Sequence, residues 1–268
     1  MKLLTRLLIL ATLVAPAACK DAGAPDGDPP AMLSDATFVA DFSNFQNSPS
    51  PVAALSGAAP AAGSNWIYSA VVVGFWNTAL AVTLVAPVAA FRAAIGQTPT
   101  GENGAWVWRY NFNIGTAQHS ARLEARPATG GIDWDMYMSK SGEYTDFHWY
   151  EGFSRLDATS GTWTLQRAPN QDVKFIDIAW TRNAALSTGD IKYTNVTPGS
   201  AENGSYILQA TTPSISYNSF MELGSASTSN VTRIEWNRAS KVGRVRDPAN
   251  FGDSNWHCWD VNLNNVAC

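Results

Sequence analysis

After residue 100, hydrophobic and polar side chains alternate with a period of two residues. In WVWRYNFNI (106–114), the aromatic residues and Ile114 share one face of an extended chain, and Arg109, Asn111 and Asn113 share the other. The alternation recurs in IDWDMYM (132–138), TWTLQR (162–167), FIDIAW (175–180), SYILQA (205–210) and RIEWNR (233–238). It is typical of strands with one face on a core and one in solvent. Short turn sequences such as ATGG, KSGE and ENGS separate the stretches, so we expect an antiparallel meander.

A different pattern precedes these strands. No Asp, Glu, Lys or Arg occurs from Phe42 to Phe91. Within this stretch, NWIYSAVVVGFWNTALAVTLVAPVAAF continues into RAAIG and predicts one long helix over about 64–95, with Ser64 or Asn65 as its N-cap and Gly96 at its end. Pro87 lacks a backbone N–H, so we expect it to kink the helix near this position or to split it in two. The helix is apolar almost all round, which predicts burial in protein or in lipid.

Together these patterns predict a mainly β protein. We expect about ten strands in an antiparallel meander, which forms a curved sheet or an open barrel around one long buried apolar helix. The stretch TFVADF (37–42) is expected to be an earlier strand. No linker composition occurs later in the chain, so residues 36–268 are expected to form a single β-rich domain.

The first residues predict export and lipid attachment. In MKLLTRLLILATLVAPAAC (1–19), Lys2 and Arg6 precede an apolar stretch that is too short for a membrane span, and small residues lead to Cys19. The APAAC end resembles a bacterial lipobox, which implies that Cys19 is lipidated; cleavage at an A-x-A-like site is the alternative. Residues 20–35 are rich in Pro, Gly and Asp and are expected to form a flexible tether. The expected location is the cell envelope, as an outer-membrane lipoprotein that faces the periplasm or the surface.

The three cysteines fit this location. If Cys19 carries lipid, Cys258 and Cys268 remain in an oxidising compartment, where we expect them to form a structural disulfide. Their spacing is not that of a redox Cys-x-x-Cys motif, and His257 would be a single additional metal ligand. A membrane span at 66–91 would return the C-terminal part to the cytoplasm and keep these cysteines reduced. A core helix is therefore favoured over a span.

Three segments resemble a known family. SDATFVADFSNF, NWIYSAVVVGFWNTALAVTLVAPVAAF and FGDSNWHCWDVNLNNVAC are similar to segments of an uncharacterised lipoprotein family of Bacteroidetes-type bacteria. The similarity runs from about residue 33 to the end of the chain, and NWHCWD…C is its most specific part. The resemblance implies a class and a location. It implies no activity and transfers no site residues.

Candidate chemistry is sparse. The segment DFHWYE places Asp146, His148 and Tyr150 on one strand face with Glu151 adjacent, a set that could hold a divalent ion or orient a general base. A solvated strand face is the simpler interpretation, and we expect no metal or other cofactor. Asp133 and Asp135 also share a face about 7 Å apart, as in a glycosidase pair or a solubilising face.

The Asx-rich end offers a second set of oxygens. Asp247, Asn250, Asp253 and Asn255 could bind calcium, although Asx residues are also favoured in turns. Their spacing does not match an EF-hand loop.

The 11 tryptophans provide either an aromatic core or a ligand groove. Trp134, Trp149 and Trp163 are the candidate groove residues. The net charge of −4 argues against a nucleic-acid partner, because phosphate binding requires a basic patch.

The favoured function is therefore a lipid-anchored binding or scaffold module of the envelope, for an apolar ligand, a glycan or a protein. The alternatives are a hydrolase of envelope polymers that uses Asp or Glu, and a purely structural surface lipoprotein. Catalytic activity is the less favoured class. An apolar cavity beside residues 66–91 would favour a ligand carrier, and His148 or convergent carboxylates in a cleft would favour an enzyme.

Overall fold

The computed structural model describes residues 23–39 and 64–268. The predicted signal peptide with Cys19 and the first residues of the predicted tether lie outside these ranges. The described helices are η1 (Asp35–Thr37, a 3-10 helix), α3 (Ser64–Thr83), α4 (Val85–Ala94) and α5 (Pro248–Phe251). The strands are β1 (Thr100–Glu102), β2 (Ala105–Ile114), β3 (Ala117–Ala128), β4 (Gly131–Lys140), β5 (Tyr144–Arg155), β6 (Ser160–Ala168), β7 (Gln171–Asn183), β8 (Thr188–Asn195), β9 (Tyr206–Thr211), β10 (Ser219–Gly224), β11 (Val231–Trp236), β12 (Gly243–Arg246), β13 (His257–Trp259) and β14 (Asn265–Val266).

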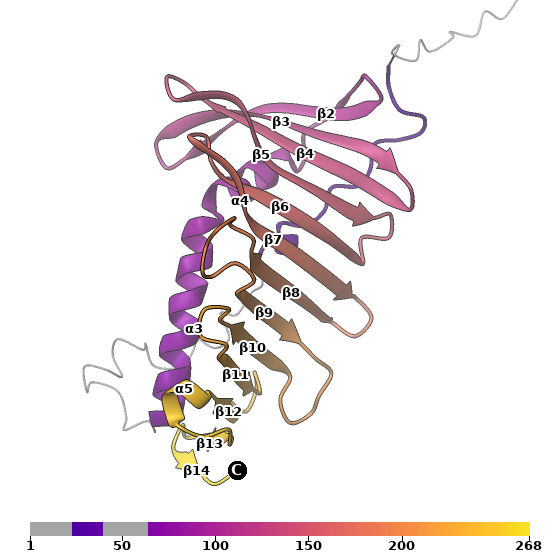
Figure 1. The fold of residues 1–268 in the computed structure, drawn as a ribbon. Coiled ribbons are helices and arrows are strands. Elements are labelled where there is room, and N and C mark those ends of the chain that lie inside the picture. The colour runs from indigo at the N-terminus through magenta and orange to yellow at the C-terminus, as the bar shows by residue number, and fades with distance from the viewer. Residues whose placement is uncertain (1–22, 40–63) are drawn as a thin grey trace, which may run out of the picture.

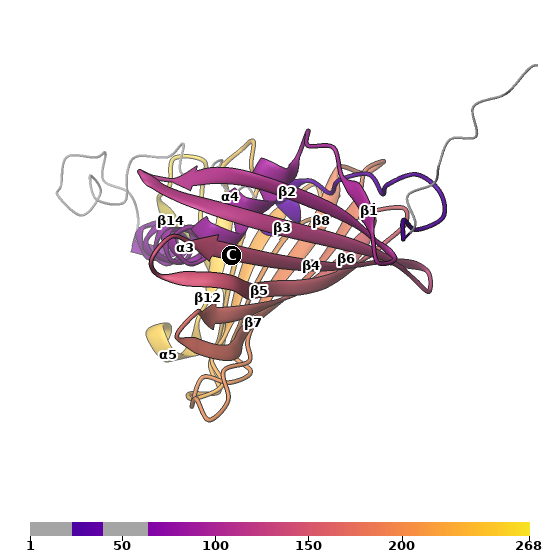
Figure 2. The same ribbon diagram turned by 90° about the horizontal axis from the view of Figure 1, so that it is seen from above.

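The strands form one 14-stranded sheet in which each strand pairs with its neighbours in sequence. Every pairing is antiparallel, as turns this short require. The strands β1 and β14 are the two edges, so the sheet is open and does not close into a barrel. Figures 1 and 2 show the sheet twisting and curving, with both long helices on one side of it. The predicted meander and mainly β class are confirmed.

Strand register gathers the apolar residues on one face, which we call the inner face. A row of directly paired side chains crosses β2 to β7 and consists of Trp108, Leu123, Met136, Tyr150, Leu165 and Ile176. A one-residue slip would turn each of them toward solvent, so the alternating pattern itself fixes the register. Phe38 lies on this row from the N-terminal segment and stacks on Trp163 with ring centroids 4.6 Å apart. The opposite side of the sheet is the outer face.

The apolar segment forms two helices, which is the split, rather than the kink, among the two effects expected of Pro87. Helix α3 ends at Thr83, and α4 begins at Val85. Pro87 has no N–H to donate to the Thr83 carbonyl four residues earlier, and its ring crowds that carbonyl. The chain therefore breaks at Leu84, just before the proline. Leu84 itself is buried in the core.

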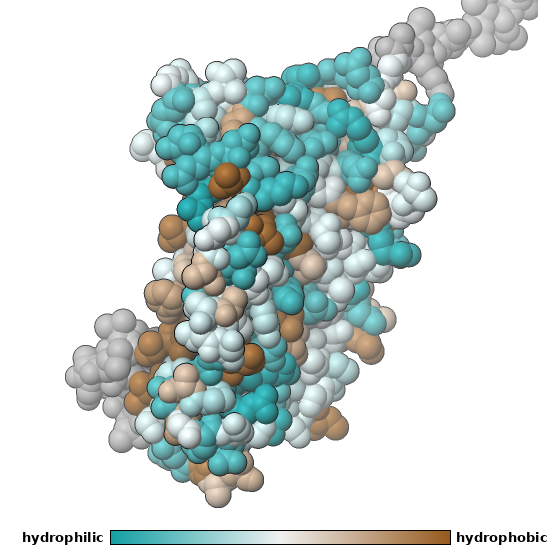
Figure 3. Space-filling view, in the orientation of Figure 1, coloured by the Kyte–Doolittle hydropathy of each residue, from teal (hydrophilic) through white to brown (hydrophobic). Residues whose placement is uncertain are grey.

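Burial of the helices differs from expectation along α3. Helix α4 packs on β2 and buries Val88, Phe91 and Ala94. On α3, Trp66, Ala70, Val73 and Leu80 face the protein, whereas the side chains of Phe75 and Val82 are 62% and 69% exposed. Figure 3 shows apolar residues along this edge of the molecule. The sheet covers one side of α3 and does not wrap around it, and α3 is by length and composition able to span a membrane.

The N-terminal segment also departs from expectation. Thr37 lies in η1, and neither Phe38 nor Val39 is in a strand, so the predicted strand at 37–42 is wrong for its described residues. Residues 40–42 lie outside the described ranges. The Ser34 hydroxyl accepts a hydrogen bond from the Ala36 N–H and caps η1, a local contact that competes with strand formation. Leu33, placed in the predicted tether, is buried in the core.

The C-terminal hairpin caps the start of α3. The sulfurs of Cys258 and Cys268 are 2.12 Å apart, at disulfide distance. The Asn65 N–H donates to the Asn265 side-chain oxygen at 3.1 Å, and the Asn65 side chain donates to the Cys258 carbonyl at 3.0 Å. A helix N-terminus leaves backbone N–H groups without intrahelical partners. Here one of them is satisfied by a residue from the other end of the domain.

Candidate binding site

The predicted Asp146–His148–Tyr150 face does not form, because β5 contains a bulge. Met136 pairs with Tyr150 and Tyr137 pairs with His148, so Trp149 has no partner across the β4–β5 pair. The extra residue shifts the alternation of the strand. Tyr150 consequently points into the core, and His148 lies with Glu151 on the outer face. Asp146 has a left-handed backbone with φ 49° and pairs with Arg122 at 2.9 Å, away from His148.

Asp135 takes the place that we had predicted for Asp146. The His148 Nε2 lies 2.9 Å from Asp135 Oδ1, and His148 stacks on Tyr137 with centroids 4.8 Å apart. The hydrogen bond to the Asp135 carboxylate raises the pKa of His148 despite partial burial, which alone would lower it. Potential ligand atoms of Asp135, His148 and Glu151 all lie within 4.8 Å of one another, close enough to share a divalent ion.

Existing ion pairs already use the carboxylates of this cluster. Arg126 donates to Asp135 at 3.0 Å, and Lys174 donates to Glu151 at 2.7 Å. A cation would have to compete with both partners for these carboxylates. The cluster also lies half-exposed on the outer face, opposite the helices, where nothing encloses a substrate. Asp133 is exposed on the same face, and its predicted pairing with Asp135 has no enclosing cleft either.

The three tryptophans predicted for a groove have different positions. Trp134 and Trp163 are buried in the core, and the Trp134 indole donates to the Ser154 hydroxyl at 2.9 Å. Their burial gives no support to a ligand-binding role for these two residues. Trp149, at the bulge, is half-buried. Its ring centroid lies 5.8 Å from that of Tyr144 and 5.4 Å from that of Phe147. The aromatic-core alternative accounts for Trp134 and Trp163.

Asp247, one of the four residues predicted as calcium ligands, has a structural role. Asp247 is buried and accepts hydrogen bonds from Thr232 at 2.6 Å, from Asn230 at 2.9 Å and from the Tyr68 hydroxyl. Its side chain also accepts from two backbone N–H groups as the N-cap of α5. Burial alone would raise the pKa of Asp247, but these hydrogen bonds outweigh it and lower that pKa. Asp247 thus joins α3, β11 and α5, and its lone pairs are used.

A cavity lies between α3 and the inner face of the sheet, and we call it the groove. Its volume is about 580 Å³, within the roughly 300–1,000 Å³ of small-molecule sites. Trp76, Ala79, Leu80 and Thr83 of α3 form one wall. The inner-face residues opposite them are Ile176, Tyr193, Ile207, Leu223 and Thr232. The cavity therefore lies beside the apolar helix, where we expected one if the protein is a carrier.

Polar residues surround one end of the groove, which we call its mouth. They come from the ends of β6 and β8 and from the following loops, and comprise Arg167, Asn195, Thr197, Glu202, Ser205, Ser225 and Asn230. Outside the lining of the groove, the Gln209 side chain donates to the Asn77 side chain at 3.0 Å and holds α3 to the sheet. We did not predict these residues from the sequence. The spacing of residues 76, 79, 80 and 83 on one helix side was a signal for the wall, but the mouth depends on loops that converge only in three dimensions.

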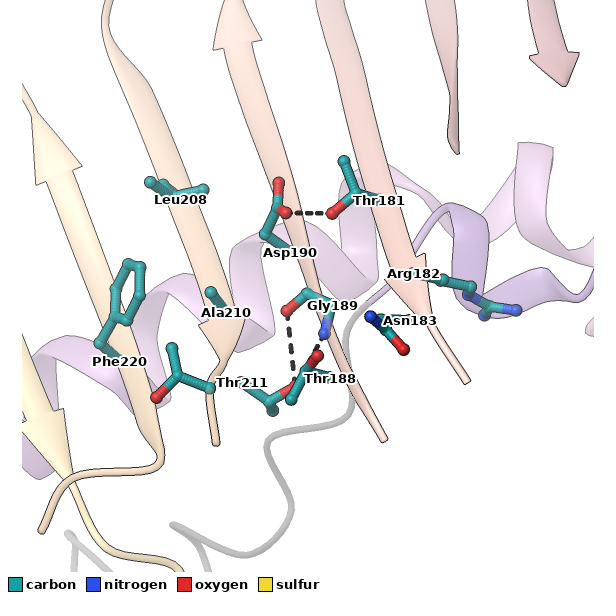
Figure 4. Close-up of a pocket in the computed structure, with 11 residues that line it drawn as sticks. Thr181, Arg182, Asn183, Thr188, Gly189, Asp190, Leu208, Ala210, Thr211 and Phe220 are labelled. Carbon is teal, nitrogen blue, oxygen red and sulfur yellow. Dashed lines mark hydrogen bonds between the residues drawn. The ribbon is translucent and has the colours of Figure 1, made fainter. Parts of the chain in front are cut away.

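A second hollow, of about 380 Å³, lies on the outer face between β7 and β10. Figure 4 shows Leu208, Asp190 and Phe220 on the near side of these strands, with the helix passing behind them. Asp190 already accepts a hydrogen bond from Thr181. One face of the Phe220 ring is covered by the Arg233 guanidinium, 3.6 Å from the ring centroid. This hollow therefore offers less free binding surface than the groove.

Comparison with protein-family models, curated proteins and solved structures finds no match for this chain. The resemblance to an envelope lipoprotein family therefore remains a prediction.

Proposed function

We propose that this protein is a lipid-anchored binding module of the bacterial cell envelope that holds an apolar ligand in the groove between α3 and the sheet. The carrying observation is the groove itself, a cavity of about 580 Å³ with an uncharged helix as one wall. Apolar and aromatic walls with a few polar groups at one end are the usual composition of small-molecule sites. The predicted lipid at Cys19 would keep the module at a membrane, the source of apolar ligands.

The enzyme alternative has less support. The cluster of Asp135, His148 and Glu151 lies on the exposed outer face, and a general acid or base works best where substrate is enclosed and water excluded. A purely structural role leaves the cavity without a purpose. The aromatic rings at Trp134 and Trp163 are buried, which removes the support we had expected for glycan stacking.

A pair of alanines on α3 allows a controlled test. Ala79 lines the groove, whereas Ala81 is exposed on the same helix and does not line it. Ala79→Trp should fill the cavity, and Ala81→Trp should leave it open. We expect the neutral fluorescent probe N-phenyl-1-naphthylamine to bind the full chain carrying Cys19→Ala, used without detergent. Its affinity should fall about tenfold or more with Ala79→Trp and stay unchanged with Ala81→Trp. Equal binding by both variants, or no binding at all, would refute the proposal.

A further inference from the structure

The groove combines two kinds of lining. Leu80, Ile176 and Ile207 provide hydrocarbon surface from one helix and two strands. The residues of the mouth add hydroxyl, amide and charged side chains. A ligand that matches both is apolar along most of its length and polar at one end, because an apolar group placed over the polar side chains would separate them from water.

Arg167 is the charged group at the mouth with hydrogen-bonding capacity to spare. Among the described residues, its guanidinium makes one long contact, 3.5 Å to the Thr197 hydroxyl, and lies 6.0 Å from the Phe175 ring centroid. No carboxylate of the described chain lies within ion-pair distance of it. Arg167 is exposed, so a ligand head group can reach it from the mouth. A guanidinium presents five N–H donors in a planar fork that fits a carboxylate or phosphate.

Glu202 is the acidic residue that lines the groove, and its side chain is already engaged. Its carboxylate accepts hydrogen bonds from the hydroxyls of Ser205, Ser225 and Ser227. These bonds, with that from Ser205 the strongest, hold the pKa of Glu202 below its usual range. The carboxylate is thus fixed toward its own loops. The charged group at the mouth that remains available to a ligand is therefore the Arg167 guanidinium, a cation.

We infer that the ligand of the groove is a single-chain amphiphile with an anionic head group. Its alkyl chain packs between α3 and the inner face, against Trp76, Leu80 and Ile207, and its head group accepts hydrogen bonds from Arg167. This inference rests on the proposed function and adds the chemical class of the ligand. A carboxylate or a phosphate would serve equally as the head group, since both accept two parallel N–H bonds from arginine.

The test compares ligands with the same chain and different head groups. Hexadecanoate, hexadecyl phosphate and neutral hexadecanol compete for N-phenyl-1-naphthylamine bound to the full chain carrying Cys19→Ala. We expect at least one anionic ligand to bind about tenfold tighter than hexadecanol, and the two anions identify the preferred head group. Arg167→Gln should reduce the ratio to about one without weakening hexadecanol. Arg238→Gln is the matched control, because Arg238 is exposed and outside the groove.

The outcomes separate this inference from the proposed function. Equal affinity of all three ligands, or an anion preference that survives Arg167→Gln, overturns the anionic head group but leaves an apolar binding module in place. Failure of the probe to bind, or its insensitivity to Ala79→Trp, overturns both. If Arg167→Gln does not fold, Arg167→Lys keeps the charge and loses the fork. A reduced anion preference in that variant supports the inference, and an unchanged one contradicts it.

Discussion

Two neighbouring residues show how one-sided the packing of the apolar segment is. Leu84 is buried at the break between α3 and α4, whereas Val82 is exposed. We predict that Leu84→Asp lowers the free energy of unfolding by several kcal/mol, because a charge would be buried without a partner. Val82→Asp should lower it by less than about 1 kcal/mol, as for a typical surface change. Urea denaturation of both variants measures the difference, and similar losses would show that the outward side of α3 is covered.

His148 gives the outer face a pH-dependent contribution to stability. Its hydrogen bond to Asp135 raises the pKa of the folded protein above the unfolded value of about 6.5. The contribution is therefore fully present below about pH 6.5 and is lost as the pH rises through the folded-state pKa. We predict that His148→Asn costs up to about 1 kcal/mol at pH 5.5, the size of a partly exposed ion pair, and less at high pH.

Urea denaturation across this pH range measures the His148 contribution. Asp135→Asn provides the control, because without the carboxylate the cost of adding His148→Asn should no longer fall as the pH rises. A cost of His148→Asn that grows with pH in the otherwise unchanged protein would contradict the assignment of the proton to this pair.

Local sequence determines some residue positions here and leaves others open. The faces of Trp108, Leu123 and Met136 follow from a period of two, which is written into each strand separately. The positions of Tyr150 and His148 depend on the register between β5 and β4, in which Trp149 is the unpaired residue of a bulge. A bulge of this kind depends on the partner strand, so we assigned His148 to the wrong set of neighbours from its own strand.

At the scale of elements, the start of α3 depends on a hairpin 200 residues away. We predict that Asn265→Ala removes the cap of Asn65 and lowers the free energy of unfolding by about 1 kcal/mol. Hydrogen exchange at the first turn of α3 should accelerate. Asn264→Ala is the control, because the Asn264 side chain is exposed and donates no hydrogen bond to α3 among the described residues. Reduction of the Cys258–Cys268 pair should act like Asn265→Ala, since it frees the hairpin that holds the cap.

The presence of a helix before Arg92 was predictable from the sequence, but the way in which the sheet packs on it was not. The stretch before Arg92 is long, uncharged and apolar, and Gly96 follows its end with a left-handed backbone, and both are local signals of a helix. Its even hydrophobicity suggested that the sheet wraps around it, yet Phe75 is mostly exposed. The composition of a helix shows how apolar it is. How much of that helix the sheet buries depends on the width and curvature of the sheet, which other residues determine. The polar mouth of the groove was missed for the same reason.

At the scale of the whole molecule, the open sheet explains why a groove exists. A closed barrel of this many strands would place the cavity inside it. Here the sheet stops at β1 and β14, and α3 runs along one side of it (Figure 1). The groove lies between this helix and the inner face. The alternating pattern predicted a meander, but it left open whether the sheet closes. Closure depends on shear and strand tilt summed over all strands.

The proposed location leads to a prediction for the whole chain. We predict that Cys19→Ala releases the protein from the membrane fraction or blocks its processing, because the lipid would be lost. Fractionation and mass measurement of both forms test this. Cys268→Ala should leave membrane attachment unchanged, although it removes the disulfide. Normal maturation and envelope attachment of the Cys19→Ala protein would exclude the lipoprotein assignment.

The cap between Asn65 and Asn265 also sets an order of events. Helix α3 is among the first parts of the domain to be synthesised, and the residue that completes its first turn follows 200 positions later. Until that residue arrives, the uncharged helix has an unfinished end and no C-terminal hairpin beside it. If the chain is exported from its N-terminus, this segment crosses the membrane long before its partner does. The interval is a window in which a chaperone that shields apolar chain segments would have most effect.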